Sequence, residues 1–308
     1  MKSLINSRNS AILLALFVVF LWATSWVLIK IGLEAIPALT FAGLRYFLGF
    51  VFLLPIFFKT DGPASLRSLS RRNWSKLLLL GLLLFAVTQG SIFIALTYLP
   101  AVTTNLLWNF SSVAVGLLGI RLLKERPTLI QWAGIFLAMV GAIVYFYPAS
   151  FPGKYQAGLI AAVIGIIANV GASILGRDIN RSGDLRPLTV TVVSMGIGST
   201  TLLIASGIFQ EMPNIGLQGW AIIVWLAAMN TALAFTLWNF TLRSLSATES
   251  SVINGTMLIW IPILAIVFLG EHITTKEWIG LIAAGIGTLI VQMRNPKALI
   301  HFFSRKRS

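Results

Sequence analysis

Long apolar runs, separated by short polar links, dominate the pattern along this chain. A helix that crosses a bilayer needs about 20 mainly apolar residues, because the hydrocarbon layer is about 30 Å thick and each residue adds about 1.5 Å. Ten runs come close to that length: Ala11–Ile31, Ala38–Phe58, Trp74–Leu96, Val102–Leu123, Leu129–Tyr147, Tyr155–Leu175, Leu188–Phe209, Trp220–Leu242, Ser251–Leu269 and Trp278–Gln292. The pattern therefore predicts an all-α integral membrane protein with ten transmembrane helices.

Composition narrows the class of protein further. Hydrophobic residues make up 57% of the 308 residues and charged residues only 10%, whereas soluble domains carry about 25% charged residues. A net charge of +14 is typical of nucleic-acid-binding proteins, but here the charges stand in short clusters between apolar runs. We therefore expect no soluble domain and no nucleic-acid partner. The chain has no cysteine, which excludes disulfides, thiolate metal sites and cysteine nucleophiles.

The distribution of Lys and Arg predicts the orientation in the membrane. Cytoplasmic loops retain an excess of both residues. With the N-terminus inside, all of the 23 Lys and Arg residues except Lys30, Arg45, Lys154 and Lys276 fall on the cytoplasmic side. Ten spans then place both termini in the cytoplasm, and the basic tail, residues 293–308, is expected to lie on the anionic inner leaflet. We expect a multi-pass protein of the cell (inner) membrane.

The chain also contains an internal repeat. When the sequence is shifted by the 146 residues that separate Trp74 from Trp220, Glu125 falls on Glu271 and Thr128 on Thr274. About 15 of about 68 positions are identical without a gap, which is well above chance for apolar sequence. The repeat predicts two related halves, residues 11–147 and 155–292, with five spans each. Because five is odd, the halves are expected to sit in opposite orientations, an architecture that recurs in transporters.

Both halves carry the same signature, E-x-x-T followed by W-x-G. It stands in LLKERPTLIQWAGIFLAMVGAIV and again in IPILAIVFLGEHITTKEWIGLIAAGIGTLIV, and each copy follows a matching segment, LTYLPAVTTNLL or LRSLSATESSVI. With LWATSWVLIKIGLEAIPALTFAGLRYFLGF near the start, these segments resemble EamA units of the drug/metabolite transporter superfamily. The resemblance covers nearly the whole chain. It implies a ten-span exporter-like fold around a central cavity, lined by spans 1, 3 and 4 and by spans 6, 8 and 9.

Polar and aromatic side chains inside the spans are candidates for a substrate pathway, because polar groups deep in a membrane face the protein interior or a water-filled cavity. Those in span 4 share one helix face through their three- and four-residue spacing. A bulky aromatic wall with a few amide groups suits a small organic solute. The alternative for each residue is a hydrogen bond between neighbouring helices. The candidates are Trp22, Ser25, Trp26, Gln89, Asn105, Trp108, Asn109, Ser112, Asn169, Ser173, Asn230, Trp238 and Asn254.

Two of the cations that remain on the outer side lie within spans. Lys30 ends span 1, with Glu34 one turn further, and Arg45 lies about one-third of the way into span 2. One interpretation is a structural cluster of Lys30, Arg45 and Glu34, or snorkelling to the interface. The other is a guide on the outer side for a carboxylate-bearing substrate. The sequence places no Asp or Glu at mid-membrane depth, so facilitated diffusion, exchange and coupling through a carboxylate at a span end all stay open.

Small residues mark two further spans. Gly134, Ala138 and Gly141 in span 5 correspond through the repeat to Gly280, Ala284 and Gly287 in span 10. Small residues at such spacing let helices approach closely. We expect spans 5 and 10 to form a packing face or a homodimer face.

A secondary transporter is the function that these observations favour. We expect it to move amino acids, metabolites or amphiphilic drugs, as an exporter, by alternating access around the cavity, with no cofactor and no metal. The alternatives are a membrane enzyme and a structural or receptor protein. An enzyme needs clustered nucleophiles, bases or metal ligands, which two histidines outside the spans and scattered carboxylates do not provide.

Overall fold

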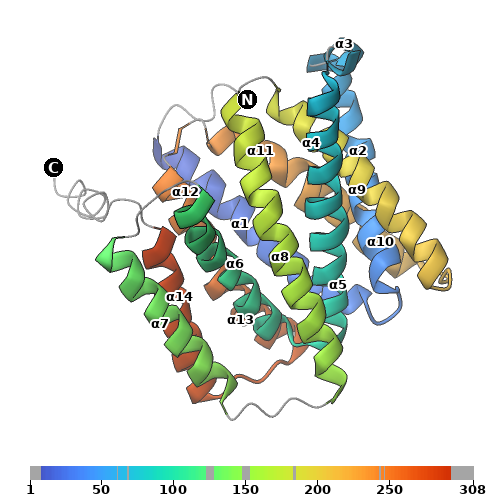
Figure 1. Cartoon of the computed structure of the whole chain (residues 1–308). Helices are drawn as coiled ribbons and strands as arrows, with labels where there is room; N and C mark the ends of the chain where they lie inside the picture. Colours follow the sequence, from blue (N-terminus) through green and yellow to red (C-terminus); the bar gives the residue numbers. More distant parts are fainter. Residues whose placement is uncertain are drawn as a thin grey trace.

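In the computed structural model, the chain folds into a bundle of long helices (Figure 1). The structure describes residues 8–60, 62–67, 69–122, 128–147, 153–182, 185–242, 244–245 and 247–292. It contains only helices, turns and links within these residues. The predicted tail, residues 293–308, lies outside the described residues.

The helices follow the predicted runs closely. In the first half they are α1 (Arg8–Gly32), α2 (Ala38–Thr60), α3 (Gly62–Arg67), α4 (Arg71–Leu80), η1 (Gly81–Thr88), α5 (Gln89–Tyr98), α6 (Ala101–Leu122) and α7 (Leu129–Phe146). In the second half they are α8 (Gly153–Ser182), α9 (Pro187–Phe209), α10 (Leu217–Ala227), η2 (Ala228–Leu233), α11 (Ala234–Thr241), α12 (Ala247–Gly255), α13 (Met257–Leu269) and α14 (Thr275–Gln292).

Eight helical stretches of the described chain are long and apolar enough to cross a membrane. They match eight of the ten predicted runs. The two remaining runs are helical as well, and they form α6, with 22 residues, and α14, with 18 residues. The chain is therefore an all-α protein with many candidate membrane spans.

Two stretches of π-helix interrupt the third and eighth predicted spans. They are η1, between α4 and α5, and η2, between α10 and α11. The repeat shift carries Gly81–Thr88 onto residues 227–234, so η2 lies inside the image of η1. In both segments a threonine hydroxyl donates to the carbonyl five residues earlier: Thr88 to Leu83 at 2.7 Å and Thr231 to Leu226 at 3.0 Å. Such segments are rare and often stand at functional sites.

The predicted small-residue seam is confirmed as a contact between α7 and α14, which lie side by side in Figure 1. A Cβ atom added at Gly141 would lie 2.6 Å from the carbonyl oxygen of Gly280. One added at Gly287 would lie 2.6 Å from that of Gly134. Backbones this close leave no room for side chains. The start of α7 lies beside the end of α14, since the Gln131 side-chain amide donates to the carbonyl of Val291 at 3.2 Å, so the two helices run antiparallel.

The same pair of helices begins in the same way. In α7, Thr128 accepts from the Gln131 amide at 3.3 Å, and the Gln131 side chain accepts from the Thr128 amide at 3.0 Å. In α14, Thr274 and Glu277 form the equivalent bonds at 3.3 and 2.7 Å. Such capping boxes satisfy amide groups that have no partner within the helix. They explain why the signature threonine occurs once in each half.

One predicted span is not continuous. The run Ser251–Leu269 forms two helices, α12 and α13, which meet in a turn at Thr256. Gly255 at the end of α12 stands against Leu289 of α14, where a Cβ would collide with the leucine side chain. The sequence pattern did not predict this interruption, because apolar residues dominate the run as a whole.

Candidate functional site

A layer of hydrogen-bonded polar side chains crosses the interior of the bundle. It joins α1, α2 and α5 of the first half to η2 of the second half. We call it the polar layer, and it consists of Thr24, Ser25, Arg45, Tyr46, Gln89, Asn230 and Thr231. All seven side chains are buried or half-buried. Polar groups in such surroundings need partners, so their arrangement fixes how the helices meet.

Asn230 anchors one end of the polar layer. Its side-chain amide donates to the hydroxyls of Thr24 and Ser25, both at 3.0 Å, and to the carbonyl of Leu21. All three acceptors belong to α1. The Asn230 side chain is completely buried, and its Oδ1 atom has no partner among the described residues. This contact ties the π-helix of the second half to the first helix of the chain.

Two neighbouring residues of α2 continue the polar layer in two directions. The Nε of Arg45 donates to the Thr231 hydroxyl at 3.3 Å, and the Tyr46 hydroxyl donates to Gln89 Oε1 at 2.7 Å. Arg45 therefore reaches η2, whereas Tyr46 reaches the residue that follows η1. The Arg45 guanidinium also lies 5.0 Å from the centre of the Tyr46 ring. One helix thus contacts both interrupted spans.

The candidates of span 4 lie on α6. Asn109 donates to the carbonyl of Asn105 at 2.9 Å and to its Oδ1 at 3.3 Å. Asn105 is buried, and its Nδ2 has no partner among the described residues. Trp108 is half-buried, and its ring stands against Gly165 of α8. Asn105 thus has an unused donor, and Trp108 joins the two halves.

The aromatic candidates of spans 1 and 8 meet. Trp22 on α1 lies 5.2 Å from Trp238 and 5.6 Å from Phe235 between ring centres, and both partners belong to α11. Aromatic pairs at such separations add about 0.5–1.5 kcal/mol beyond the burial of area. The structure therefore brings together Trp22 and Trp238, as well as Ser25 and Asn230.

The other candidates lie apart from these contacts. Trp26 is buried in the apolar core, Asn169 and Ser173 are half-buried on α8, and Asn254 is exposed on α12. The side chain of Ser112 lies outside the described part of the structure.

Lys30 and Arg45 have different surroundings. The Lys30 ammonium donates to the carbonyls of Leu96 and Leu99 at 2.6 and 2.7 Å, at the end of α5. Immediately after this end, the Glu271 carboxylate accepts from the amides of Ala101 and Val102 at 2.6 and 3.1 Å, at the start of α6. A cation at a helix C-terminus and an anion at an N-terminus both complement the helix dipole. Together they hold the short link between α5 and α6.

Glu271 offers a direct test of this arrangement. The change Glu271→Gln keeps the shape of the side chain but removes its charge and one acceptor oxygen. We expect it to lower the free energy of unfolding by about 1–2 kcal/mol, the range of a charged hydrogen bond at a helix N-terminus. Thermal unfolding of the purified protein would measure it. Glu211→Gln, an exposed position in the link after α9, is the matched control. Equal stability of the two variants would contradict the cap.

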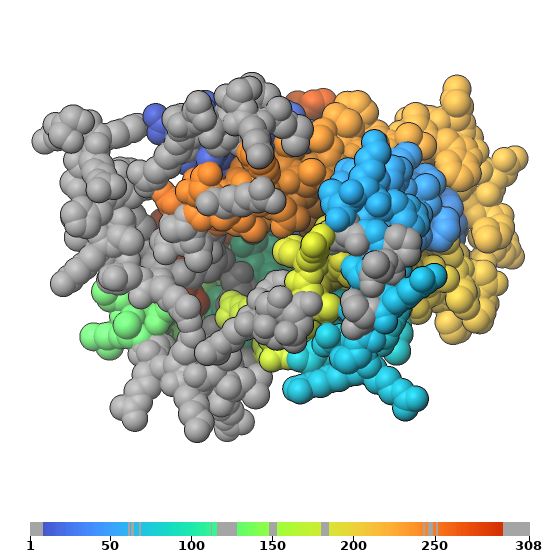
Figure 2. All heavy atoms as spheres, turned by 90° about the horizontal axis from the view of Figure 1, so that it is seen from above, coloured from blue at the N-terminus to red at the C-terminus, as the bar shows by residue number. Residues whose placement is uncertain are grey.

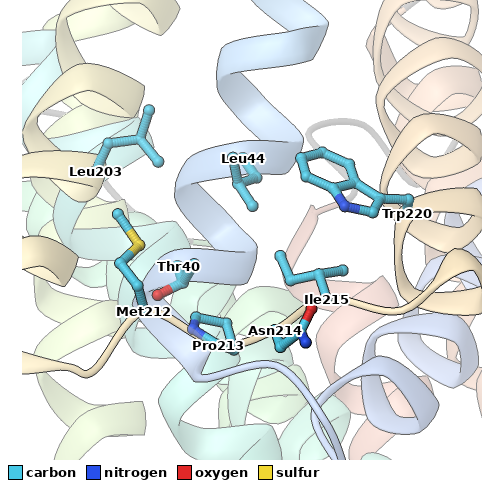
Figure 3. Close-up of a pocket in the computed structure, with 8 residues that line it drawn as sticks. All are labelled: Thr40, Leu44, Leu203, Met212, Pro213, Asn214, Ile215 and Trp220. Carbon is cyan, nitrogen blue, oxygen red and sulfur yellow. The ribbon is translucent and has the colours of Figure 1, made fainter.

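An open groove of about 360 Å³ lies at the end of the bundle opposite to α3, between α2, α9 and the link to α10 (Figure 3). The groove contains no candidate pathway residue. Its surface is mainly apolar, and the Thr40 hydroxyl already donates to Gln210 Oε1 at 3.3 Å. The lining residues are Thr40, Leu44, Leu203, Met212, Pro213, Asn214, Ile215 and Trp220.

A recess opens on the other end of the bundle. Figure 2 looks down on this end and shows orange atoms from the region of α11 and yellow-green atoms of α8 around it, with green atoms of α6 deep inside. The helix at its floor is the one that carries Asn105, Trp108 and Asn109. The helix visible in the recess therefore carries candidate pathway residues, whereas the lining of the apolar groove includes none.

Comparison with known proteins agrees with this architecture. The EamA-like transporter family matches the chain twice, over residues 9–147 and 156–293. Since the two matches cover most of the chain, the protein belongs to the EamA-like transporter family and is a multi-pass membrane transporter of the drug/metabolite type. The resemblance inferred from the repeated signature is thereby confirmed.

Several relatives extend over nearly the whole chain. "Uncharacterized transporter YvbV" of Bacillus subtilis is 30% identical over 300 residues, 92% of this chain and 90% of its own length. "Uncharacterized inner membrane transporter YedA" of Escherichia coli K12 is 26% identical over 281 residues, 87% and 86% of the two chains. "Probable amino-acid metabolite efflux pump" of Salmonella typhimurium is 27% identical over 291 residues, 89% and 92%. A solved structure titled "Crystal structure of protein" has the same fold, with a TM-score of 0.66 at 18% identity, and the match covers 92% of this chain and 98% of that one.

The sequence analysis did not select four residues whose hydrogen bonds connect the helices of the site: Thr24, Tyr46, Thr231 and Glu271. Thr231 stands beside the candidate Asn230, and Tyr46 stands beside Arg45, so each could have been found as the neighbour of a polar residue in an apolar run. Glu271 was recognised as part of the repeated signature but not as a helix cap, because its partners lie 170 and 169 residues away.

Proposed function

We propose that this protein exports small organic solutes, with amino acids and related metabolites first among them, across the inner membrane by alternating access. The observation that carries the proposal is the polar layer, because it joins the two halves within the apolar interior. Inverted-repeat carriers bind solutes near the midplane at the interface between repeats. The efflux pump named for amino-acid metabolites among the relatives supports the solute class and the direction.

Ten spans in two inverted halves are part of this proposal. Two pairs of contacts support the inversion. Gly134 meets Gly287 and Gly141 meets Gly280, and the repeat shift exchanges these two pairs with each other. A pseudo-two-fold axis between α7 and α14 accounts for this exchange and for their antiparallel direction. The matching positions of η1 and η2 support the same relation between the third and eighth spans.

The pathway that we propose runs from the recess beside α8 and α11 to the polar layer. Asn105, Trp108 and Asn109 of α6 form one wall, and Trp22 with Trp238 forms another. At the opposite end, Lys30 and Glu271 hold the link between α5 and α6 closed against α1 and the loop after α13. Transport then requires that one half rocks against the other. This motion would close the recess and open the end of the bundle that Lys30 and Glu271 hold closed.

Flux measurements test the proposal. The purified protein would be reconstituted in liposomes and supplied with radiolabelled amino acids, organic amines and the amphiphilic cation ethidium, one at a time. We expect saturable flux of at least one solute, absent from empty liposomes. If no solute of this panel crosses faster than in empty liposomes, the proposed function is wrong.

The proposed orientation predicts which residues a reagent can reach. Ser70 caps α4 at the end of the bundle that carries α3, and Asn214 lies in the link after α9 at the other end. Because the chain has no cysteine, single Cys residues can be introduced cleanly. In intact cells an impermeant maleimide should label Asn214→Cys and should label Ser70→Cys only after the membrane is opened. Labelling of Ser70→Cys in intact cells would reverse the orientation.

A further inference from the structure

Arg45 is a buried cation whose terminal nitrogens have no hydrogen-bond partner among the described residues. The residue is only 5% exposed. It is the eighth residue of α2, so it lies about 10 Å along the helix from its start. Its Nε donates to Thr231, and its guanidinium lies over the ring of Tyr46. Within the described part of the chain, neither terminal nitrogen forms a hydrogen bond. Neither of them is among the fully occluded atoms that lack a partner.

No carboxylate of the described chain neutralises this charge. The described acidic residues stand at helix ends or in links, and Arg45 forms no ion pair with any of them: Glu34, Asp178, Glu211, Glu249, Glu271 and Glu277. Lys30 in span 1, by contrast, donates to two carbonyls. A buried charge without a counter-charge is costly. A ligand anion bound to Arg45 would therefore offset the cost of burying its charge.

The geometry of the guanidinium selects the kind of anion. With Nε used by Thr231, the two terminal nitrogens remain side by side at the end of a planar group. This pair matches the two oxygens of a carboxylate, which arginine binds through two parallel hydrogen bonds. The Thr231 bond also fixes the guanidinium in place before the ligand arrives, which lowers the entropy cost of binding.

We propose that the terminal nitrogens of Arg45 bind the carboxylate of the transported solute. The inference rests on the proposed transport function and names its substrate class, which is carboxylate-bearing organic solutes. Arg45 belongs to the first half and Thr231 to the second, so a carboxylate bound here touches the contact between the halves. Binding at this place couples the solute to the rocking motion, because the motion must alter the Arg45–Thr231 contact.

The closing experiment compares acids with their neutral counterparts. Thermal-shift titrations on purified protein would use L-leucine, L-phenylalanine and L-methionine, each beside its carboxamide, and liposome flux would be measured for the same pairs. The variants are Arg45→Gln, Arg45→Lys and the control Arg71→Gln, an exposed position in the first turn of α4. Arg45→Lys keeps the charge but cannot offer two parallel hydrogen bonds, so it tests the geometry even if Arg45→Gln fails to fold.

We expect the wild-type protein and Arg71→Gln to bind at least one acid about tenfold or more tightly than its amide. Both Arg45 variants should lose that preference while their affinity for the amide changes by less than about twofold. Retained acid preference in the Arg45 variants overturns the proposal. So does a wild-type protein that carries ethidium but binds none of the acids, a result that leaves the transport function standing. A protein that carries no solute contradicts both.

Discussion

Replacing Gly287 by valine is expected to separate α7 from α14 and to destabilise the protein. A Cβ at Gly287 would lie 2.6 Å from the carbonyl oxygen of Gly134, and it would also meet the backbone of Ala138. Both neighbours belong to the main chain, which cannot rotate away as a side chain can. Forcing extra atoms into a packed contact costs about 1–3 kcal/mol, and contacts between helices in lipid depend on such close packing.

Gly207→Val is the matched control for this prediction. Gly207 also lies within a long helix, α9, but a Cβ there would have nothing within 4 Å. Both variants make the same change in intrinsic helix propensity, from glycine to a β-branched residue, so their difference isolates the contact. Thermal unfolding of the purified proteins should show a lower midpoint for Gly287→Val only. Equal midpoints would mean that α7 and α14 separate without cost.

The sequence predicted the helices because the apolar pattern records how each segment meets lipid and core. The ten runs all became helical, and the seam of α7 and α14 followed from Gly134, Gly141 and their images. A repeated spacing of small residues has one physical use in a membrane, which is close approach of helices. Such features depend on residues close together in the sequence, so the sequence pattern predicts them.

Features that depend on distant partners were not predictable. The Arg45–Thr231 bond joins residues 186 positions apart, and Asn230 meets Ser25 across 205 positions. Asn230 and Ser25 were both recognised as polar residues in apolar spans, but no sequence pattern indicates that they contact each other. The π-helical segments were not predicted either, because both lie inside longer runs that the sequence pattern presents as continuous spans. The interpretation of Lys30, Arg45 and Glu34 as a structural cluster used nearness in sequence, which does not show that Lys30 donates to carbonyls at the end of α5.

Replacing Trp108 by alanine is expected to reduce transport strongly in a protein that still folds. Trp108 is half-buried on α6, the helix at the floor of the recess, next to the amide groups of Asn105 and Asn109. A wide aromatic ring at such a place provides contact area for an apolar part of the solute, worth about 0.5–1.5 kcal/mol beyond burial. Its ring also stands against Gly165 of α8, so it joins the halves that must move during transport.

The control for Trp108→Ala is Phe136→Ala on α7. Phe136 is 70% exposed on the outer surface of the bundle, where in our proposal it meets lipid rather than solute. Flux would be measured in liposomes at matched protein amounts, with the solute that the wild-type protein carries best. We expect the flux of Trp108→Ala to fall about tenfold, which corresponds to about 1.4 kcal/mol, and that of Phe136→Ala to stay within about twofold of the wild type. Thermal unfolding of both variants separates a loss of fold from a loss of transport. If Trp108→Ala keeps its flux, or if Phe136→Ala loses as much, then α6 does not line the pathway and the solute must pass elsewhere between the two halves.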